Sequence, residues 1–200
     1  MFTGIITSTG VFQGYRQGRR EILVEAPEAA PKLEPGDSLA VDGVCLSLVR
    51  RDGSGLVFGL SRETLEKTTL GLLKTGARLN LELPLSPSSL LSGHLVSGHV
   101  DGLGKVVRFT ARGPGKRLTV SYPRELAPFF VVKGSVAVNG VSLTVASLEA
   151  ETFDAELIPL TLGATNLGRL RPGAPVNLEC DMIGKYVYNS VVTGGKRIRP

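Results

Sequence analysis

Two stretches of this 200-residue chain repeat each other at a fixed distance of 97 positions. Residues 38–82 align with residues 135–179 without a gap, and 18 of the 45 pairs are identical. A period of this length is the size of a small domain and is too long for a solenoid unit. The chain is therefore expected to hold two copies of one domain, and its function should explain why two are needed.

The composition and the spacing of apolar runs favour an all-β fold. Gly (25) and Pro (12) are frequent, as in turn-rich proteins. Short apolar runs recur roughly every 8–12 residues between turn signals, which is typical of antiparallel strands. They lie at 21–24, 38–41, 46–49, 56–60 and 78–83, and again at 117–121, 135–138, 143–146, 152–157 and 174–179. Six or so short strands per copy favour a closed barrel, which leaves no exposed edge.

The same patterns divide the chain into an N-terminal barrel at 1–86, a C-terminal barrel at 94–181 and a short helix with a tail at 182–200. Two short helical turns are expected inside the barrels, at 123–129 and at 64–70, the latter capped by Thr64. In the tail, apolar residues recur at helical spacing, and Gly194-Gly195 should end the helix. This helix either joins copies of the chain or docks back on its own barrel.

Charge and composition disfavour several classes of function. The net charge is +5, but aromatic residues make up only 6% of the chain and Trp is absent, so a nucleic-acid surface is not expected. No export signal is visible, and the longest run without charged residues, 83–100, holds two prolines and five serines, so no membrane span is expected. The two cysteines occupy non-equivalent positions, which favours a reducing cytoplasm over a disulfide framework.

Each copy carries small polar side chains at alternate strand positions: Cys45 and Ser47 in the first, Ser142 and Thr144 in the second. Alternate residues share one face of a strand, so their neighbours should fill the core. A solvated sheet face is the plain interpretation. Recurrence of the pair in both copies favours two similar small ligands, one per copy. Elsewhere the copies differ, since Lys133 matches Gly36 and Asp181 matches Pro84, so the two sites should be similar but not equivalent.

The junction between the copies carries the only two histidines, in Gly93-His94-Leu-Val-Ser97-Gly98-His99. A zinc site would need a third ligand, and no His, Cys or carboxylate cluster supplies one, so no metal is expected. General acid–base chemistry or polar binding fits better. Cys45 is a candidate nucleophile, but its counterpart is Ser142, so a binding role fits equally well.

Three pieces, in order and at their spacings, resemble the α-subunit type of riboflavin synthase: the start Met1-Phe2-Thr3-Gly4-Ile5, the block Asp42-Gly-Val-Cys45-Leu, and Gly93-His94 to Asp101. The resemblance covers residues 1 to about 185. It implies two six-stranded Greek-key barrels, a C-terminal helix that joins three subunits, and association with lumazine synthase. It also implies conversion of two molecules of 6,7-dimethyl-8-ribityllumazine into riboflavin and 5-amino-6-(ribitylamino)uracil by transfer of a four-carbon unit, without redox cofactor or metal.

The resemblance also implies site residues, with each active site between the N-terminal barrel of one subunit and the C-terminal barrel of its neighbour. Those nearest the chemistry are Phe2, Cys45, His94, His99 and Asp181. The first barrel's site would comprise Gly4, Ile5, Ile6, Ser38, Cys45, Leu46, Ser47, Gly59, Leu60, Ser61, Arg62, Glu63 and Thr64. The second would comprise Gly98, His99, Val100, Lys133, Ser142, Leu143, Thr144, Glu156, Leu157, Ile158, Pro159, Leu160 and Thr161.

The sequence departs from the family in places. Ser47 keeps the hydroxyl of a threonine-type position, whereas Asn139 replaces a common Asp and loses its charge. The C-terminal helix is short, with Gly184 inside it. The main alternative function is a lumazine- or flavin-binding carrier that keeps the fold without catalysis. A flavoreductase-like FAD barrel would need an attached nicotinamide-binding domain, and the chain has no Gly-x-Gly-x-x-Gly motif to support one.

Overall fold

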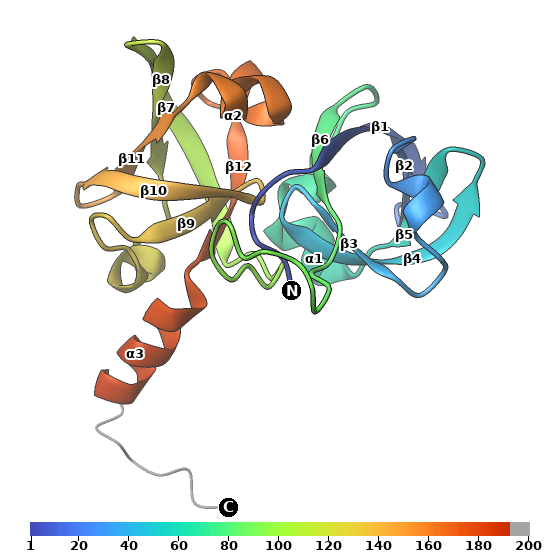
Figure 1. The fold of residues 1–200 in the computed structure, drawn as a ribbon, viewed down its shortest axis with the longest axis horizontal. Helices are drawn as coiled ribbons and strands as arrows, with labels where there is room; N and C mark the ends of the chain where they lie inside the picture. Colours follow the sequence, from blue (N-terminus) through green and yellow to red (C-terminus); the bar gives the residue numbers. More distant parts are fainter. Residues whose placement is uncertain (193–200) are drawn as a thin grey trace, which may run out of the picture.

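The computed structural model describes residues 1–192, which form two six-stranded barrels side by side with few helices (Figure 1). The first barrel contains β1 (Ser8–Arg16), β2 (Glu21–Glu25), β3 (Ser38–Val41), β4 (Val44–Asp52), β5 (Gly55–Gly59) and β6 (Arg78–Glu82). The second contains β7 (Gly102–Arg112), β8 (Gly115–Ser121), β9 (Ser135–Val138), β10 (Val141–Leu148), β11 (Thr152–Leu157) and β12 (Pro175–Cys180).

Both barrels close in the same strand order. The first runs β1-β2-β5-β4-β3-β6 and the second runs β7-β8-β11-β10-β9-β12, each with its last strand paired to its first. This is a Greek-key arrangement, and the predicted fold class is confirmed. A bulge lies between Leu48 and Arg50 in β4 and at the matching place, between Val145 and Ser147, in β10. Such bulges bend strands and help small sheets close.

Strands β1 and β7 are the two that the sequence patterns did not predict. Glycine and polar residues interrupt the apolar ones in β1, and glycine and charged residues interrupt them in β7, so neither reads as an apolar run. Their glycines are nevertheless required: a Cβ on Gly10 would lie 2.8 Å from the Glu25 carbonyl oxygen, and one on Gly104 would lie 2.8 Å from that of Ser121. Close packing of neighbouring strands, rather than local propensity, therefore defines these two strands.

The helical segments are short. They are η1 (Ala30–Lys32), α1 (Arg62–Lys67), η2 (Thr69–Gly71), η3 (Arg124–Phe129), α2 (Pro159–Ala164), η4 (Asn166–Arg169) and α3 (Met182–Val192). The predicted turn at 123–129 is confirmed by η3. The predicted capping by Thr64 is wrong, because α1 begins earlier and the Ser61 hydroxyl caps it by accepting from the Thr64 N–H at 3.0 Å. Within residues 1–192, no helix is long and apolar enough to cross a membrane.

The inner faces of the strands supply one apolar core per barrel. Val44, Leu46 and Leu48 of β4 point inward, whereas Cys45 between them is half-buried and Ser47 is exposed. Strand β10 repeats this alternation with buried Val141 and Leu143. The predicted separation of core and polar positions on these two strands is confirmed.

The two barrels meet across a pseudo-twofold axis. Phe2 and Val96 form an antiparallel bridge there, with N–H to carbonyl distances of 2.7 and 3.1 Å in the two directions. Their side chains are fully buried with Ala40 and Ala137 in a small cluster between the barrels. Phe2 therefore lies at the barrel interface.

A buried polar network crosses the same axis. The Asn80 side chain donates to the Asn139 carbonyl oxygen at 2.9 Å, and Asn177 donates to that of Asp42 at 2.8 Å. The network is asymmetric where Asn166, the counterpart of Thr69, also donates to the Asp42 carboxylate at 2.8 Å. Burial raises the pKa of Asp42 to about 7, although hydrogen bonds from the Asn80 backbone and the Asn166 side chain act in the opposite direction.

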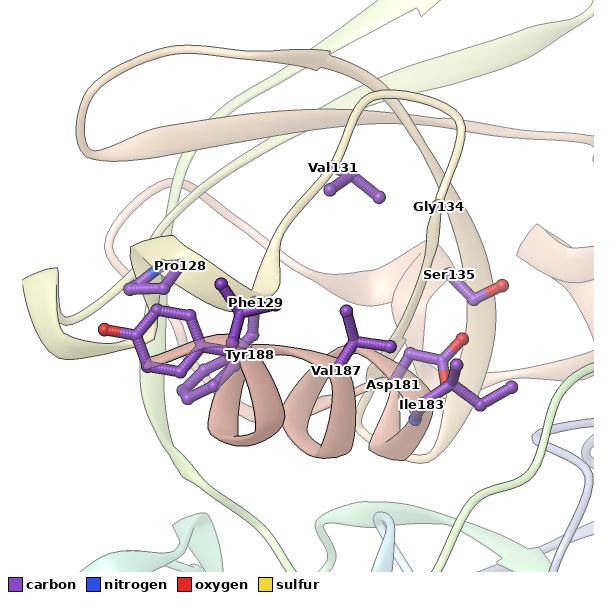
Figure 2. Close-up of a pocket in the computed structure, with 11 residues that line it drawn as sticks. Pro128, Phe129, Val131, Gly134, Ser135, Asp181, Ile183, Val187 and Tyr188 are labelled. Atoms are coloured by element: carbon purple, nitrogen blue, oxygen red, sulfur yellow. Dashed lines mark hydrogen bonds between the residues drawn. The ribbon is translucent and has the colours of Figure 1, made fainter. Parts of the chain in front are cut away.

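Helix α3 projects from the second barrel (Figure 1) and rests partly on it. The Tyr188 and Phe129 rings meet edge to face at 5.3 Å, and the Lys185 ammonium lies 2.6 Å from the Asp101 carboxylate. Figure 2 shows the apolar groove that Ile183 and Val187 line along this contact. Part of the surface of α3 is therefore covered by contacts with the second barrel. The predicted end at Gly194-Gly195 lies outside the described residues.

Candidate functional site: two matching cavities

Each barrel has a cavity beside the strand that carries its small polar side chain. The N-cavity, of about 460 Å³, is lined by Val44, Cys45, Ser61, Glu63, Thr64, Lys67, Thr68, Gly98, His99, Val100 and Asp101. The C-cavity, of about 570 Å³, is lined by Arg112, Arg117, Lys133, Ser142, Leu143, Thr144, Ala146, Glu156, Ile158 and Thr161. Cys45 and Ser142 occupy matching places in the two linings, as do Thr64 and Thr161. The duplication of the sequence is thus a duplication of a cavity.

The segments that precede the two barrels are exchanged between them. We call residues 2–6 the first arm and residues 96–100 the second arm. The Gly4 carbonyl accepts a hydrogen bond from the Ser142 N–H at 2.8 Å, and the Gly98 carbonyl accepts one from the Cys45 N–H at 2.8 Å. Each arm therefore lies against the strand that lines the other barrel's cavity.

This exchange corrects the expected grouping of residues. Gly98, His99 and Val100 were expected at the second barrel's site, but they line the N-cavity with Cys45. Conversely, Gly4 contacts Ser142, and Ile6 packs against the core of the second barrel. The physical reason is the close approach of backbones, because a Cβ on Gly4 would lie 2.6 Å from that of Ser142, and one on Gly98 would lie 2.5 Å from that of Cys45.

His94 belongs to the C-cavity side. Its Nδ1 lies 2.7 Å from the Ser142 hydroxyl, and its backbone N–H donates to the Thr3 carbonyl at 3.1 Å. The buried Nε2 has no hydrogen-bond partner among residues 1–192. Burial lowers the pKa of the imidazole, and the negative charge of Asp181 partly opposes this shift. A neutral, buried imidazole bonded to a hydroxyl can accept or return a proton near neutral pH.

The N-cavity has a different histidine in a different position. His99 is exposed, lies in the second arm beside Cys45, and its backbone N–H donates to the Ser97 hydroxyl at 3.2 Å. The matching position of the first arm, three residues after Phe2, is Ile5. The two cavities therefore share an architecture but not an acid–base group, which suits two ligands with different roles.

The charges of the two linings also differ. Arg112, Arg117 and Lys133 face the C-cavity together with one carboxylate, Glu156. The N-cavity has one cation, Lys67, and the carboxylates of Glu63 and Asp101. Lys133 adopts a φ of +69°, a left-handed conformation that is unusual for a lysine. The C-cavity is thus the more favourable place for an anion.

Several expected site residues lie outside both linings. Leu46 and Leu157 point into the cores, so a ligand could reach only their backbone. Asp181 lies in the groove of α3, where its carboxylate accepts from the Ile183 N–H at 3.0 Å. Ile5 lines a hollow with the linker after β6. The others outside the linings are Phe2, Gly4, Ile6, Ser38, Ser47, Gly59, Leu60, Arg62, His94, Pro159 and Leu160.

Some lining residues were not expected. Val44, Lys67, Thr68 and Asp101 line the N-cavity, and Arg112, Arg117 and Ala146 line the C-cavity. Thr68 follows Thr64 by one helical turn, and the repeat itself therefore offered a signal for it. Arg112 and Arg117 come from the β7–β8 hairpin, whose place over the cavity depends on barrel closure.

Comparison with known proteins identifies the family of the two repeated domains. The lumazine binding domain family model matches twice, at residues 3–84 and 97–181. The riboflavin synthase of Mycobacterium tuberculosis is 40% identical over 210 residues, covering 98% of this chain and all of that protein. That of Bacillus subtilis is 34% identical, covering 94% and 88% respectively.

Solved structures agree on the fold. A crystal structure of LumP complexed with riboflavin superimposes with a TM-score of 0.83 at 25% identity, covering 90% of this chain and 99% of that chain. A crystal structure of LumP complexed with 6,7-dimethyl-8-(1'-D-ribityl) lumazine superimposes with a TM-score of 0.80 at 24% identity, which shows that the fold is shared. Together, the two matched domains and the near full-length relatives show that this chain belongs to the riboflavin synthase family.

Proposed function

We propose that this protein is a riboflavin synthase, which converts two molecules of 6,7-dimethyl-8-ribityllumazine into riboflavin and 5-amino-6-(ribitylamino)uracil. The observation that carries the proposal is the pair of matching cavities, because this reaction consumes two identical molecules. Four carbons leave one lumazine and enter the other, so the atoms balance without an oxidant or reductant. Holding two reactants in a fixed orientation can lower a barrier by roughly 7–11 kcal/mol.

The chemistry requires removal of a proton from the C7 methyl group of one lumazine, which leaves an anion delocalised over its ring. The cationic lining of the C-cavity suits that anion, and the neutral His94 beside Ser142 suits the proton transfer. The lumazine in the N-cavity would then lie near Cys45 and His99. In this proposal Asp181 acts through its charge on His94, and Phe2 supports the arms from the barrel interface.

The proposal includes a homotrimer formed through the C-terminal helix α3, in which the N-cavity of one subunit faces the C-cavity of the next. Its support is the exposed apolar surface of α3, where Ile183, Tyr186 and Val191 are 60%, 71% and 74% exposed. The lumazine-binding units would be residues 1–86 and 94–181. Free thiols at Cys45 and Cys180 suit a cytoplasmic enzyme, and association with lumazine synthase would supply its substrate.

One experiment separates this function from its alternative. Purified protein is mixed with 6,7-dimethyl-8-ribityllumazine alone, and riboflavin and the pyrimidine are measured by chromatography. We expect one molecule of each product for two molecules of lumazine consumed. The similarity to LumP complexes makes a carrier the second candidate. Binding of lumazine with no riboflavin formed would establish the carrier and exclude the synthase.

A further inference from the structure

Two buried glutamates hold the two arms in matching ways. Glu82, at the end of β6, accepts hydrogen bonds from the Thr3 N–H and hydroxyl, both at 2.7 Å, and from the Gly4 N–H at 3.0 Å. Glu179, 97 positions later in β12, accepts from the Ser97 N–H at 2.6 Å, the Ser97 hydroxyl at 2.7 Å and the Gly98 N–H at 3.0 Å. Both glutamates are almost fully buried, with exposures of 4% and 3%.

Burying a carboxylate is unfavourable unless hydrogen bonds replace the lost water. Here the replacement comes from the arms, and the bonds are of the strong, charge-assisted kind. Both oxygens of each carboxylate are used, one for two donors and the other for the third. A glutamine in either place would direct an amide NH₂ at an N–H or hydroxyl donor, so it could not keep all three bonds.

Each arm continues from its glutamate to the other barrel. Glu82 belongs to the first barrel, but the Gly4 that it holds accepts from Ser142 in the C-cavity. Glu179 belongs to the second barrel, but the Gly98 that it holds accepts from Cys45 in the N-cavity. The chain of contacts from each glutamate therefore ends in the opposite barrel.

We propose that Glu82 and Glu179 are crossed positioning residues: Glu82 of the first barrel shapes the C-cavity, and Glu179 of the second barrel shapes the N-cavity. Neither side chain lines the cavity that it controls. The inference rests on the proposed function only in taking the two cavities as ligand sites. If the glutamates merely stabilised their own barrels, replacing one would change its own barrel or loosen the whole molecule.

The thiol of Cys45 is a local reporter for the N-cavity. It is half-buried under Gly98, whereas Cys180 is fully buried and burial raises the pKa of its thiol to about 12. An alkylating reagent such as iodoacetamide should therefore modify Cys45 first. The double variant Cys45→Ser with Ser142→Cys moves the reporter to the C-cavity, under Gly4.

The test measures iodoacetamide modification of each reporter in the full-length protein. In the parent, Glu179→Gln should speed modification of Cys45 roughly tenfold, the size expected for losing a charge-assisted bond, and Glu82→Gln should leave it unchanged. In the Cys45→Ser, Ser142→Cys double variant, Glu82→Gln should speed modification of the relocated thiol, and Glu179→Gln should leave its rate unchanged. Glu21→Gln, which breaks the ion pair between buried Glu21 and exposed Arg50 elsewhere in the first barrel, is the matched control and should change neither rate.

Thermal unfolding of each variant separates local from global effects. Equal acceleration of both reporters by either glutamine variant would overturn the proposal, as would acceleration only within the variant's own barrel. A ligand arm adds 6,7-dimethyl-8-ribityllumazine: it should protect Cys45 in the parent and in Glu82→Gln, but less in Glu179→Gln. If the lumazine protected no variant, the proposed function would fail, while the crossed pattern of the free protein would still decide the inference.

Discussion

Gly43 and Gly140 lie back to back where the two barrels touch. A Cβ built on Gly43 would lie 2.6 Å from the Gly140 nitrogen, and one built on Gly140 would lie 2.7 Å from the Gly43 nitrogen. Both residues also have positive φ, +78° and +77°. Two requirements for glycine, one conformational and one steric, therefore coincide at the centre of the molecule.

Replacing either glycine should destabilise the protein strongly. The left-handed conformation alone costs roughly 1–2 kcal/mol for an alanine, and the clash with backbone adds to it, so Gly140→Ala should lower the free energy of unfolding by about 3 kcal/mol or more. Gly76→Ala is the control, since its φ is +88° but its Cβ would meet open space. Urea denaturation measures both. Equal losses of unfolding free energy in the two variants would show that the barrels move apart enough at this contact to accommodate a Cβ.

Asp42 should make stability fall as pH rises. Its folded-state pKa is about 7, above the ordinary value of about 4. Between these values the folded chain holds a proton that the unfolded chain has lost, so the contribution is complete below about pH 4 and is lost as pH rises through 7. Asp42→Asn cannot ionise, and at pH 8 it should unfold with a free energy roughly 2–4 kcal/mol above the parent.

The difference between parent and Asp42→Asn should shrink at pH 5, where Asp42 is protonated in the folded state. Asn139→Asp, at the matching position, should have the opposite effect and lose stability at pH 8. Urea midpoints at pH 5 and 8 for the three proteins provide the measurement. A parent and an Asp42→Asn variant that respond alike to pH would contradict the raised pKa.

His94 should set the acid limit of activity. Burial keeps its pKa below the ordinary range, so the imidazole stays neutral at pH values where an exposed histidine is charged. Turnover should therefore persist to lower pH than an ordinary histidine would allow, and it should fall as His94 becomes protonated. His94→Gln should reduce kcat about 10²-fold and abolish that limb. His99→Gln should keep the fall in activity at low pH. Loss of that fall in both variants would contradict its assignment to His94.

Lys133 adopts a strained backbone conformation and adds a positive charge to the C-cavity. Its counterpart Gly36 adopts a comparable left-handed conformation, with φ of +97°. Lys133→Gly should therefore leave the free energy of unfolding unchanged or raise it by up to about 1 kcal/mol, while weakening lumazine binding at the C-cavity. Calorimetric unfolding and lumazine titration give the two quantities. A Lys133→Gly variant that loses stability but binds lumazine normally would contradict both expectations.

The exposed apolar residues of α3 should be required for assembly. Val187 and Val191 are 57% and 74% exposed, so a paired Val187→Glu and Val191→Glu variant should sediment as a monomer if the helix joins subunits. Leu72→Glu changes an equally exposed residue (60%) on the first barrel and should leave the oligomer intact. Sedimentation velocity distinguishes these outcomes, and an unchanged parent-like oligomer in the paired variant would exclude the helix as the contact.

The barrels could be predicted from the sequence because their signals are local and repeated. Alternation around Cys45 and Ser142 identifies the inward and outward faces, and the 97-residue repeat doubles every observation. The residues that converge on the cavities were for the most part among those expected, such as Thr64 and Thr161.

The exchange of the arms could not be predicted in the same way. Thr3-Gly4 and Ser97-Gly98 are 94 positions apart, so they fall out of step with the main repeat. Their contacts with the opposite barrel join residues far apart in sequence: the Gly4 carbonyl accepts from the Ser142 N–H, and the Gly98 carbonyl accepts from the Cys45 N–H. Such pairings depend on how two finished barrels dock, and no local periodicity encodes docking. The family resemblance placed Gly98 at the second barrel's site, whereas in the structure it lines the N-cavity.

The exchanged arms also define the smallest complete unit of this architecture. One barrel alone would leave its arm without a surface to lie on and its own cavity without a covering segment. A single-copy ancestor would thus have had to associate with a second copy of itself, each lending its arm to the other. The present chain is then a fused dimer, in which covalent linkage guarantees the partner and freed the two halves to diverge at His99, Lys133 and Asp42.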